Sequence, residues 1–198
     1  MGRALRIVDV EAVYHVVVRG NNKGVIVWDV HDCEVFTGEL GAVATKYKWD
    51  VFAWCLLTNH YHVLLRAPED GLSLGFQQLN GDYSRRTNRR HDRVDHLFRN
   101  RFRWVEVLGD AHLVGAILYI ARNPLHAGLS GHARDWRYGG YRATAGVDSP
   151  PRWLVVDQVL RLFGPTPDQA RAEYERLVHG GHVLVSDTEP YVPLASTI

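Results

Sequence analysis

Two histidines one residue apart, His60 and His62, open the apolar run HYHVLLR at positions 60–66. Alternate residues of a β-strand point to the same face, so these two imidazoles would lie side by side. Histidine is the commonest metal ligand among side chains, but a half-buried, hydrogen-bonded core histidine explains the pattern equally well. The pair therefore predicts a metal site only if other ligands and a reactive group converge on it.

A second set of polar residues lies on the segment 110–122, whose pattern predicts a helix with Asp110 as N-cap that ends before Pro124. Tyr119 and Asn123 are one helical turn apart, off the main apolar stripe. Tyr119 could be a nucleophile or a residue at the rim of the core. Asn123 directly precedes the proline, so its amide is expected to be free to reach a ligand.

The segment 85–104 holds eight arginines and only two aspartates, in a chain of formal net charge +1. A solvated basic face would explain such a run. Arginine also pairs with phosphate, however, and the interleaved Phe98, Phe102 and Trp104 could stack on unpaired bases, which favours a nucleic-acid partner. The arginines predicted to contact DNA are Arg85, Arg86, Arg89, Arg90, Arg99, Arg101 and Arg103.

A further candidate DNA contact lies in the turn after the first strand, at Arg19, Asn21 and Asn22. A plain polar turn explains these residues equally well.

Alternation and apolar periodicity predict an α+β domain. The order β-α-β-β-α-β-α favours a ferredoxin-like or RRM-like antiparallel sheet with helices packed on one face. Thr58-Asn59 predicts a tight hairpin in which Asn59 has a positive φ. Residues 1–150 would form this domain, and 151–198 a C-terminal helical extension and tail. Strands are predicted over 12–20, 50–57, 60–67 and 102–108, and helices over 32–48, 72–90, 110–122 and 167–178.

Composition favours a folded protein of the cytoplasm. The apolar fraction of 46% is enough for a core. Two cysteines, Cys33 and Cys55, give no disulfide framework, and Cys55 is expected to be buried. Neither a secretory leader nor an apolar run of membrane length is evident, so we expect no membrane association.

Five segments together resemble the single-tyrosine HUH transposase family, in particular the REP-associated tyrosine transposases and the small insertion-sequence transposases. In chain order they are YHVVVRGNN, NHYHVLL, LNGDYSRRTNRR, HLFRNRF and YIARNPLHAGL. Their order and spacing carry the resemblance, which spans most of residues 13–145.

The resemblance implies a role for each residue that matches the family pattern. The paired metal ligands fall on His60 and His62, the nucleophile on Tyr119 and a third metal ligand on Asn123. The residue between the histidines is usually aliphatic in the family but is Tyr61 here. Because Tyr61 would face the other side of the strand, we expect it to pack or to lie at a surface rather than to attack DNA.

Tyr83 is the main rival nucleophile, but position 87, one turn further on, is Thr87 rather than an amide residue. We therefore expect Tyr83 to be structural or to contact DNA.

The implied activity is a metal-dependent nuclease and strand transferase. It would cleave and rejoin single-stranded, hairpin-bearing DNA through a 5′-phosphotyrosine intermediate, in transposition or repeat mobilisation. The implied cofactor is Mg²⁺ or Mn²⁺, and a ligand set rich in nitrogen suits Mn²⁺ at least as well. The protein would associate with the nucleoid when bound to DNA, and the resemblance favours a monomer over a homodimer.

Two alternatives remain open on the sequence. An RRM-like sheet with a basic flank could bind single-stranded nucleic acid without chemistry. A zinc-type hydrolase would need a further ligand, for which His15 is the candidate, although its place in the chain fits a role behind the ligands better.

Overall fold

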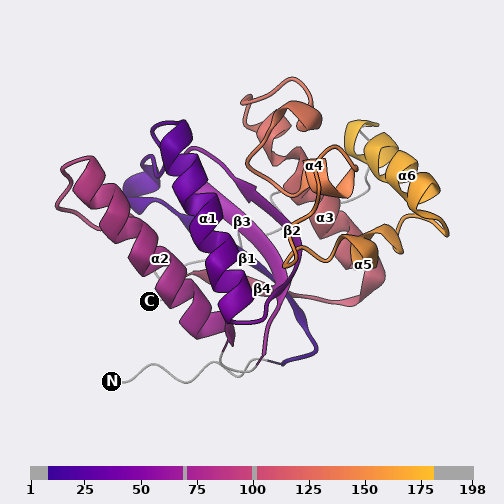
Figure 1. The fold of residues 1–198 in the computed structure, drawn as a ribbon, viewed down its shortest axis with the longest axis horizontal. Helices are drawn as coiled ribbons and strands as arrows, with labels where there is room; N and C mark the ends of the chain where they lie inside the picture. The colour runs from indigo at the N-terminus through magenta and orange to yellow at the C-terminus, as the bar shows by residue number, and fades with distance from the viewer. Residues whose placement is uncertain (1–8, 69–70, 100–101, 181–198) are drawn as a thin grey trace, which may run out of the picture.

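The computed structural model describes residues 9–68, 71–99 and 102–180 of the 198-residue chain. Figure 1 shows a central sheet flanked by helices. The strands are β1 (Val13–Arg19), β2 (Asp50–Leu56), β3 (His60–Arg66) and β4 (Arg103–Val107). The α-helices are α1 (Val30–Lys46), α2 (Gly71–Arg90), α3 (Gly109–His126), α4 (Tyr141–Thr144), α5 (Val156–Leu160) and α6 (Pro167–His179), and the short 3-10 turns are η1 (Asn21–Lys23) and η2 (Ala133–Asp135).

The described strands form one antiparallel sheet in the order β2-β3-β1-β4. In the β1–β3 ladder, Arg19 lies opposite His60 and Val17 lies opposite His62. In the β1–β4 ladder, Val17 also lies opposite Arg103. Directly opposed residues share a face, so His60, His62 and their cross-strand neighbours lie on one side of the sheet.

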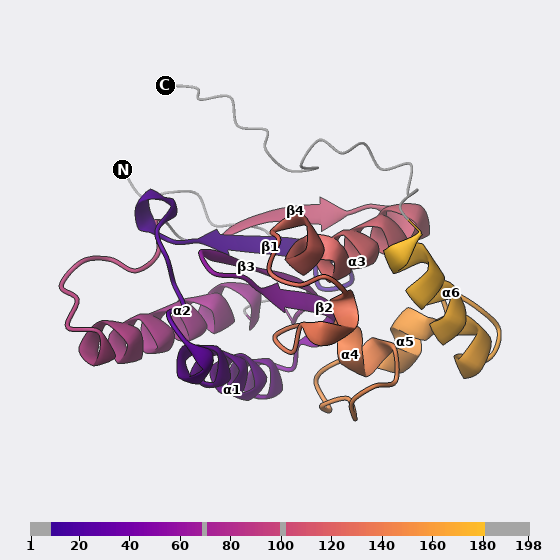
Figure 2. The ribbon, with the colours of Figure 1, turned by 90° about the horizontal axis from the view of Figure 1, so that it is seen from above.

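The two long helices α1 and α2 cover the other side. Tyr61, between the two histidines, is fully buried there against Phe36 of α1. Its hydroxyl donates a 2.6 Å hydrogen bond to Oδ1 of Asn80 on α2. Figure 2 shows the sheet between these helices and α3, which lies across the histidine face. This architecture confirms the predicted α+β class, with α1 and α2 packed on one face of the sheet. The helices do not all lie on that face as the sequence predicted, because α3 packs on the opposite one.

The segment that follows α3 covers the outer edge of β2. Gly140 donates a backbone hydrogen bond to Trp54, and Leu56 donates one to Tyr138. Further along, the amide of Val51 donates to the carbonyl of Trp153. An uncovered edge strand would present unpaired backbone groups, so these contacts satisfy the β2 edge and attach the C-terminal segment to the sheet.

Two local predictions at α3 are wrong. The helix continues through Pro124 to His126, because a proline near the end of a helix forfeits only one late hydrogen bond, and the last turn is closed by Ala127 N–H donating to the Asn123 carbonyl. The N-cap is Leu108 rather than Asp110, and Nδ1 of His112 accepts the Leu108 N–H at 3.1 Å. That imidazole satisfies the N–H of the N-cap residue itself, one of the backbone donors at a helix start that have no intrahelical partner.

The β2–β3 turn is also built differently from the expectation. Asn59 does not belong to the described residues with positive φ. Instead, the turn is held by neighbouring loops: Ile26 N–H donates to the Thr58 carbonyl and Gly20 N–H to the Asn59 carbonyl. These external donors hold the turn without a left-handed residue.

Cys33 and Cys55 are both free and buried, as the sequence predicts for Cys55. None of the helices within residues 9–68, 71–99 and 102–180 is long and apolar enough to cross a membrane.

Candidate active site

The structure brings the two histidines of β3 next to the tyrosine of α3. The ring centroids of His60 and His62 are 5.0 Å apart, and that of Tyr119 is 5.6 Å from His62. The strand positions its histidines by alternation, and α3 presents its half-buried tyrosine from above the same face. Three residues that are up to 59 positions apart in sequence thus share one site.

His15 of β1 completes the cluster from behind. It lies diagonally across from His62 in the sheet, and its Nε2 is 2.9 Å from Nδ1 of His62. Both side chains are buried. The contact places His15 behind His62, which agrees with the role expected from its position in the chain.

His60 has a partner of its own at the tip of the hairpin. Its Nδ1 is 2.7 Å from Oδ1 of Asn59. The amide nitrogen of Asn59 in turn donates to the backbone carbonyl of Lys23, the last residue of η1, at 3.1 Å. Sequence reasoning missed this role of Asn59, although its position directly before His60 was a usable signal.

Burial keeps the site histidines neutral. Desolvation lowers the pKa of His15 to about 4 and that of His60 to about 4, and the nearby Arg19 adds to the effect on His60. Desolvation also lowers the pKa of His62 well below its usual value. Neutral imidazoles carry the lone pair that metal coordination requires.

Asn123 is buried on α3, one turn after Tyr119. Its side-chain nitrogen donates a 3.0 Å hydrogen bond to the backbone carbonyl of Tyr119. The amide is therefore not free as a whole, contrary to expectation. Its oxygen remains the atom through which Asn123 could bind a cation.

The donor set fits a divalent metal ion of the kind the family resemblance implies. Nε2 of His62 is buried and has no hydrogen-bond partner, so a bound cation would satisfy an atom that is otherwise unpaired. His60 and Asn123 would supply the remaining donors. Within the part of the chain that the structure describes, no three His, Cys, Asp or Glu side chains converge on one point, so the set expected of a zinc hydrolase is not found there.

The rival tyrosines lie on the opposite side of the sheet. Tyr61 and Tyr83 are both fully buried. The Tyr83 hydroxyl donates a 2.7 Å hydrogen bond to the backbone carbonyl of Ile26. Both are structural, as expected for Tyr61 and as one of the two roles expected for Tyr83.

The arginines predicted to contact DNA are divided between the two faces. Arg19 and Arg103 share the histidine face through their register with His60 and Val17, and both are exposed. Arg99 is exposed as well, and its N–H donates to the Arg19 carbonyl. Asn21 and Asn22 form the η1 turn beyond β1. Arg101 lies outside the described residues.

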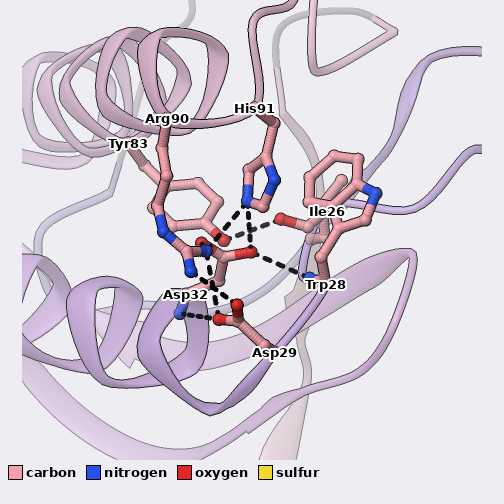
Figure 3. Close-up of polar contacts among 7 residues, drawn as sticks. All are labelled: Ile26, Trp28, Asp29, Asp32, Tyr83, Arg90 and His91. Carbon is pink, nitrogen blue, oxygen red and sulfur yellow. Dashed lines mark hydrogen bonds and ion pairs between the residues drawn. The ribbon is translucent and has the colours of Figure 1, made fainter.

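The arginines of α2 lie in the opposite layer and several are engaged in ion pairs. Arg85 pairs with Asp82, and Arg86 pairs with Glu39 of α1. Figure 3 shows Arg90 between Asp29 and the buried Asp32 at the start of α1, each with an oxygen 2.6 Å from its guanidinium. Arg89 is exposed on the same helix.

Two of the three aromatic residues interleaved with the arginines are packed inside the protein. Phe98 and Phe102 are buried. Phe98 packs on Tyr83, and Phe102 packs on Phe76 of α2. The prediction that these two rings stack on bases is wrong, because both pack into the α2 layer, while Arg99 and Arg103 are exposed.

Comparison with known proteins adds the family. The family model described as IS200-like transposase matches residues 10–121, more than half of the chain. The chain belongs to the IS200-like transposase family. The matched range includes β1, the histidine pair and the tyrosine of α3.

Individual relatives are distant. A curated protein of Haemophilus influenzae that carries the name of a REP-associated tyrosine transposase is 26% identical over 130 residues, which cover 60% of this chain and 73% of the relative. A solved structure of a REP-associated tyrosine transposase bound to a REP hairpin aligns with a TM-score of 0.61 at 15% identity. It covers 74% of this chain and 86% of the other, and it supports the fold.

Proposed function

We propose that this IS200-like transposase is a nuclease and strand transferase that cleaves and rejoins single-stranded DNA through a 5′-phosphotyrosine at Tyr119. The observation that carries the proposal is the meeting of Tyr119 with His60 and His62 on one face of the sheet. A binding module without chemistry would have no use for a tyrosine held beside two neutral imidazoles, one of them buried at His62 and the other half-buried at His60.

The step is a transesterification. The Tyr119 oxygen forms a bond to a backbone phosphorus and loses its proton. The bond from phosphorus to the 3′-oxygen breaks, and that oxygen leaves as a 3′-hydroxyl after taking up a proton. One phosphodiester bond replaces another, so the reverse attack by a 3′-hydroxyl rejoins the strand. Arg19, beside His60 on the exposed rim, supplies positive charge for the phosphate.

His60, His62 and Asn123 would hold the Mg²⁺ or Mn²⁺ ion. When bound, the ion supplies Lewis-acid stabilisation of the charge that develops on the phosphate oxygens, worth several kcal/mol in comparable sites. The protein's own contribution is a ligand set without negative charge, which keeps the site attractive to phosphate. Because two of the three ligands are imidazole nitrogens, Mn²⁺ suits the set at least as well as Mg²⁺.

The DNA is proposed to be single-stranded with a hairpin. The name of the curated relative and the hairpin bound in the solved structure support this substrate class. The residues around the histidine face would hold it through its phosphates, with the protein acting in the cytoplasm at the nucleoid. These residues are the exposed Arg19, Asn22, Arg99 and Arg103, together with the half-buried Asn21.

We also propose that the protein works as a monomer in which residues 1–150 form the catalytic unit and 151–198 an extension. The contact between Tyr119 and His62 lies within a single chain, so no second copy is required to complete the site. Light scattering of the protein with and without hairpin DNA tests this proposal, and a dimer in both samples would contradict it.

The nucleophile is tested by Tyr119→Phe, which removes the attacking oxygen and leaves the ring in place. We expect cleavage of a labelled hairpin DNA and the covalent adduct to be lost in Mn²⁺, while DNA affinity changes less than about threefold. Tyr83→Phe is the matched control. It should still form the adduct and should lower the free energy of unfolding by about 1 kcal/mol, because the buried Ile26 carbonyl loses its donor.

Persistence of the adduct in Tyr119→Phe, or its loss in Tyr83→Phe, would refute the assignment. Mapping the DNA-linked peptide of the unmodified protein identifies the attacking residue independently.

A further inference from the structure

Each imidazole of the pair has a partner at its Nδ1 atom, on the side away from Nε2. For His60 the partner is Oδ1 of Asn59, and for His62 it is Nε2 of His15. A neutral imidazole has one N–H and one lone pair, and the hydrogen bond made by one nitrogen decides which nitrogen carries the lone pair. The residues behind the pair therefore decide which atom each histidine can offer to a ligand.

The case of His60 follows from the orientation of Asn59. The Asn59 amide nitrogen donates to the Lys23 carbonyl, so its oxygen must be the atom that faces His60. An amide oxygen only accepts hydrogen bonds. Nδ1 of His60 is therefore the protonated nitrogen, and its lone pair lies on Nε2.

For His62 two arrangements fit the 2.9 Å contact with His15. If His15 donates, Nε2 of His62 carries a hydrogen, and that buried N–H has no acceptor. If His62 donates from Nδ1, Nε2 carries a buried lone pair, which a cation can satisfy. A buried donor without a partner costs about 1–3 kcal/mol. An unpaired buried acceptor carries a similar cost, but only the second arrangement loses that cost when a cation binds.

We propose that His15 and Asn59 are positioning residues that hold His62 and His60 as Nδ1–H tautomers, with both Nε2 lone pairs presented to the site. The inference rests on the proposed function, because it gives the two lone pairs their use as metal ligands. Two independent contacts from different elements, β1 and the hairpin tip, lead to the same tautomer in both rings. In water the opposite tautomer would compete, so the protein itself must impose this choice.

The tautomers can be measured in the full-length protein without metal or DNA. Two-bond ¹H–¹⁵N correlation spectra of ¹⁵N-histidine-labelled protein in EDTA distinguish a protonated from an unprotonated ring nitrogen. We expect His60 and His62 to show protonated Nδ1 and unprotonated Nε2. In His15→Leu the His62 signals should move toward the Nε2–H pattern while those of His60 stay unchanged, and Mn²⁺ affinity measured by calorimetry should fall about 10- to 100-fold.

Leu64→Val is the matched control, because Leu64 is buried opposite His15 in the same ladder and makes no contact through a ring nitrogen. It should reduce stability but leave the His62 tautomer and the Mn²⁺ affinity as they are. An Nε2–H tautomer at His62 in the unmodified protein, or unchanged His62 signals in His15→Leu, would overturn the inference.

The two hypotheses fail separately in this design. Expected tautomers in a protein that forms no DNA adduct would reject the proposed function and keep the positioning role. An adduct formed by a protein with the opposite tautomers would do the reverse.

Discussion

At the scale of single residues, burial determines the protonation state of the site histidines. His15 is only 3% exposed, and its pKa is lowered to about 4 from an ordinary value of 6.5. As the pH falls below about 6.5, the unfolded chain takes up a proton at this residue that the folded chain refuses. The stability that neutral His15 permits is therefore fully present above pH 6.5 and is lost progressively toward pH 4.

This linkage predicts an acid-sensitive site. The free energy of unfolding of the metal-free protein, from urea titrations at several pH values, should fall between pH 6.5 and 4.5. In His15→Leu this fall should be smaller, by at most about 3 kcal/mol for a pKa shift of the size found at His15. The difference in unfolding free energy between the two proteins gives the contribution of His15, because the carboxylates that titrate in the same pH range are present in both. Parallel curves for both proteins would contradict the prediction.

At the scale of elements, α3 is held from behind by the C-terminal helix α6. Arg122, between Tyr119 and Asn123 in the sequence of α3, donates from Nε to the Val178 carbonyl at 3.0 Å and from Nη2 to the Leu177 carbonyl. These carbonyls belong to the last turn of α6, where no intrahelical donor remains and the helix dipole favours a cation. The extension thus anchors the helix that carries the proposed nucleophile.

Arg122→Met should therefore loosen α6. We expect the free energy of unfolding to fall by about 2 kcal/mol, because two carbonyls lose a charged donor, and hydrogen exchange of the α6 amides to accelerate. Arg134→Met is the matched control, since Arg134 pairs with Glu175 of the same helix at 2.7 Å but is 51% exposed in its side chain. A surface pair of this kind contributes at most about 1 kcal/mol. Equal effects of the two substitutions would contradict the anchoring role.

The elements differ in how well their sequence predicts them. The strand of His60 and its neighbours were predictable because alternation and apolar character agree with the tertiary structure. The two ends of α3 were not: Nδ1 of His112 accepts the N–H of the N-cap Leu108 at the start, and the helix tolerates Pro124 in its last turn. Local propensity yields to such contacts at helix ends, where few backbone hydrogen bonds are at stake.

The candidate site was predictable in part for a similar reason. Strand alternation put His60 and His62 side by side, and helical periodicity put Tyr119 and Asn123 on one surface. That Tyr119 lies beside His62 depends on how α3 crosses the sheet, which no short pattern encodes. The hydrogen bonds of Asn59 and His15 depend on the same packing.

At the scale of the whole molecule, the sheet separates two surfaces whose arginines make different contacts. Arginines of the histidine face are exposed around the site, whereas α2 holds Arg86 and Arg90 in ion pairs with α1. Residues 85–104 form one basic segment in the sequence, but this segment begins in α2 and ends in β4, so its arginines lie in two different layers. The histidine face is therefore the side on which phosphate contacts should lie.

Salt dependence of hairpin DNA binding distinguishes the two surfaces. A phosphate contact releases counterions, so losing one lowers the slope of log K against log salt by about 0.7–0.9. We expect Arg19→Ala and Arg103→Ala each to weaken binding and to reduce the slope by about this amount, since both side chains are exposed on the histidine face. Arg85→Ala removes another exposed charge, from α2, where it pairs with Asp82, and should leave the slope unchanged. If all three variants lost the same slope, the DNA would have to contact both layers, and the histidine face could not be its principal binding surface.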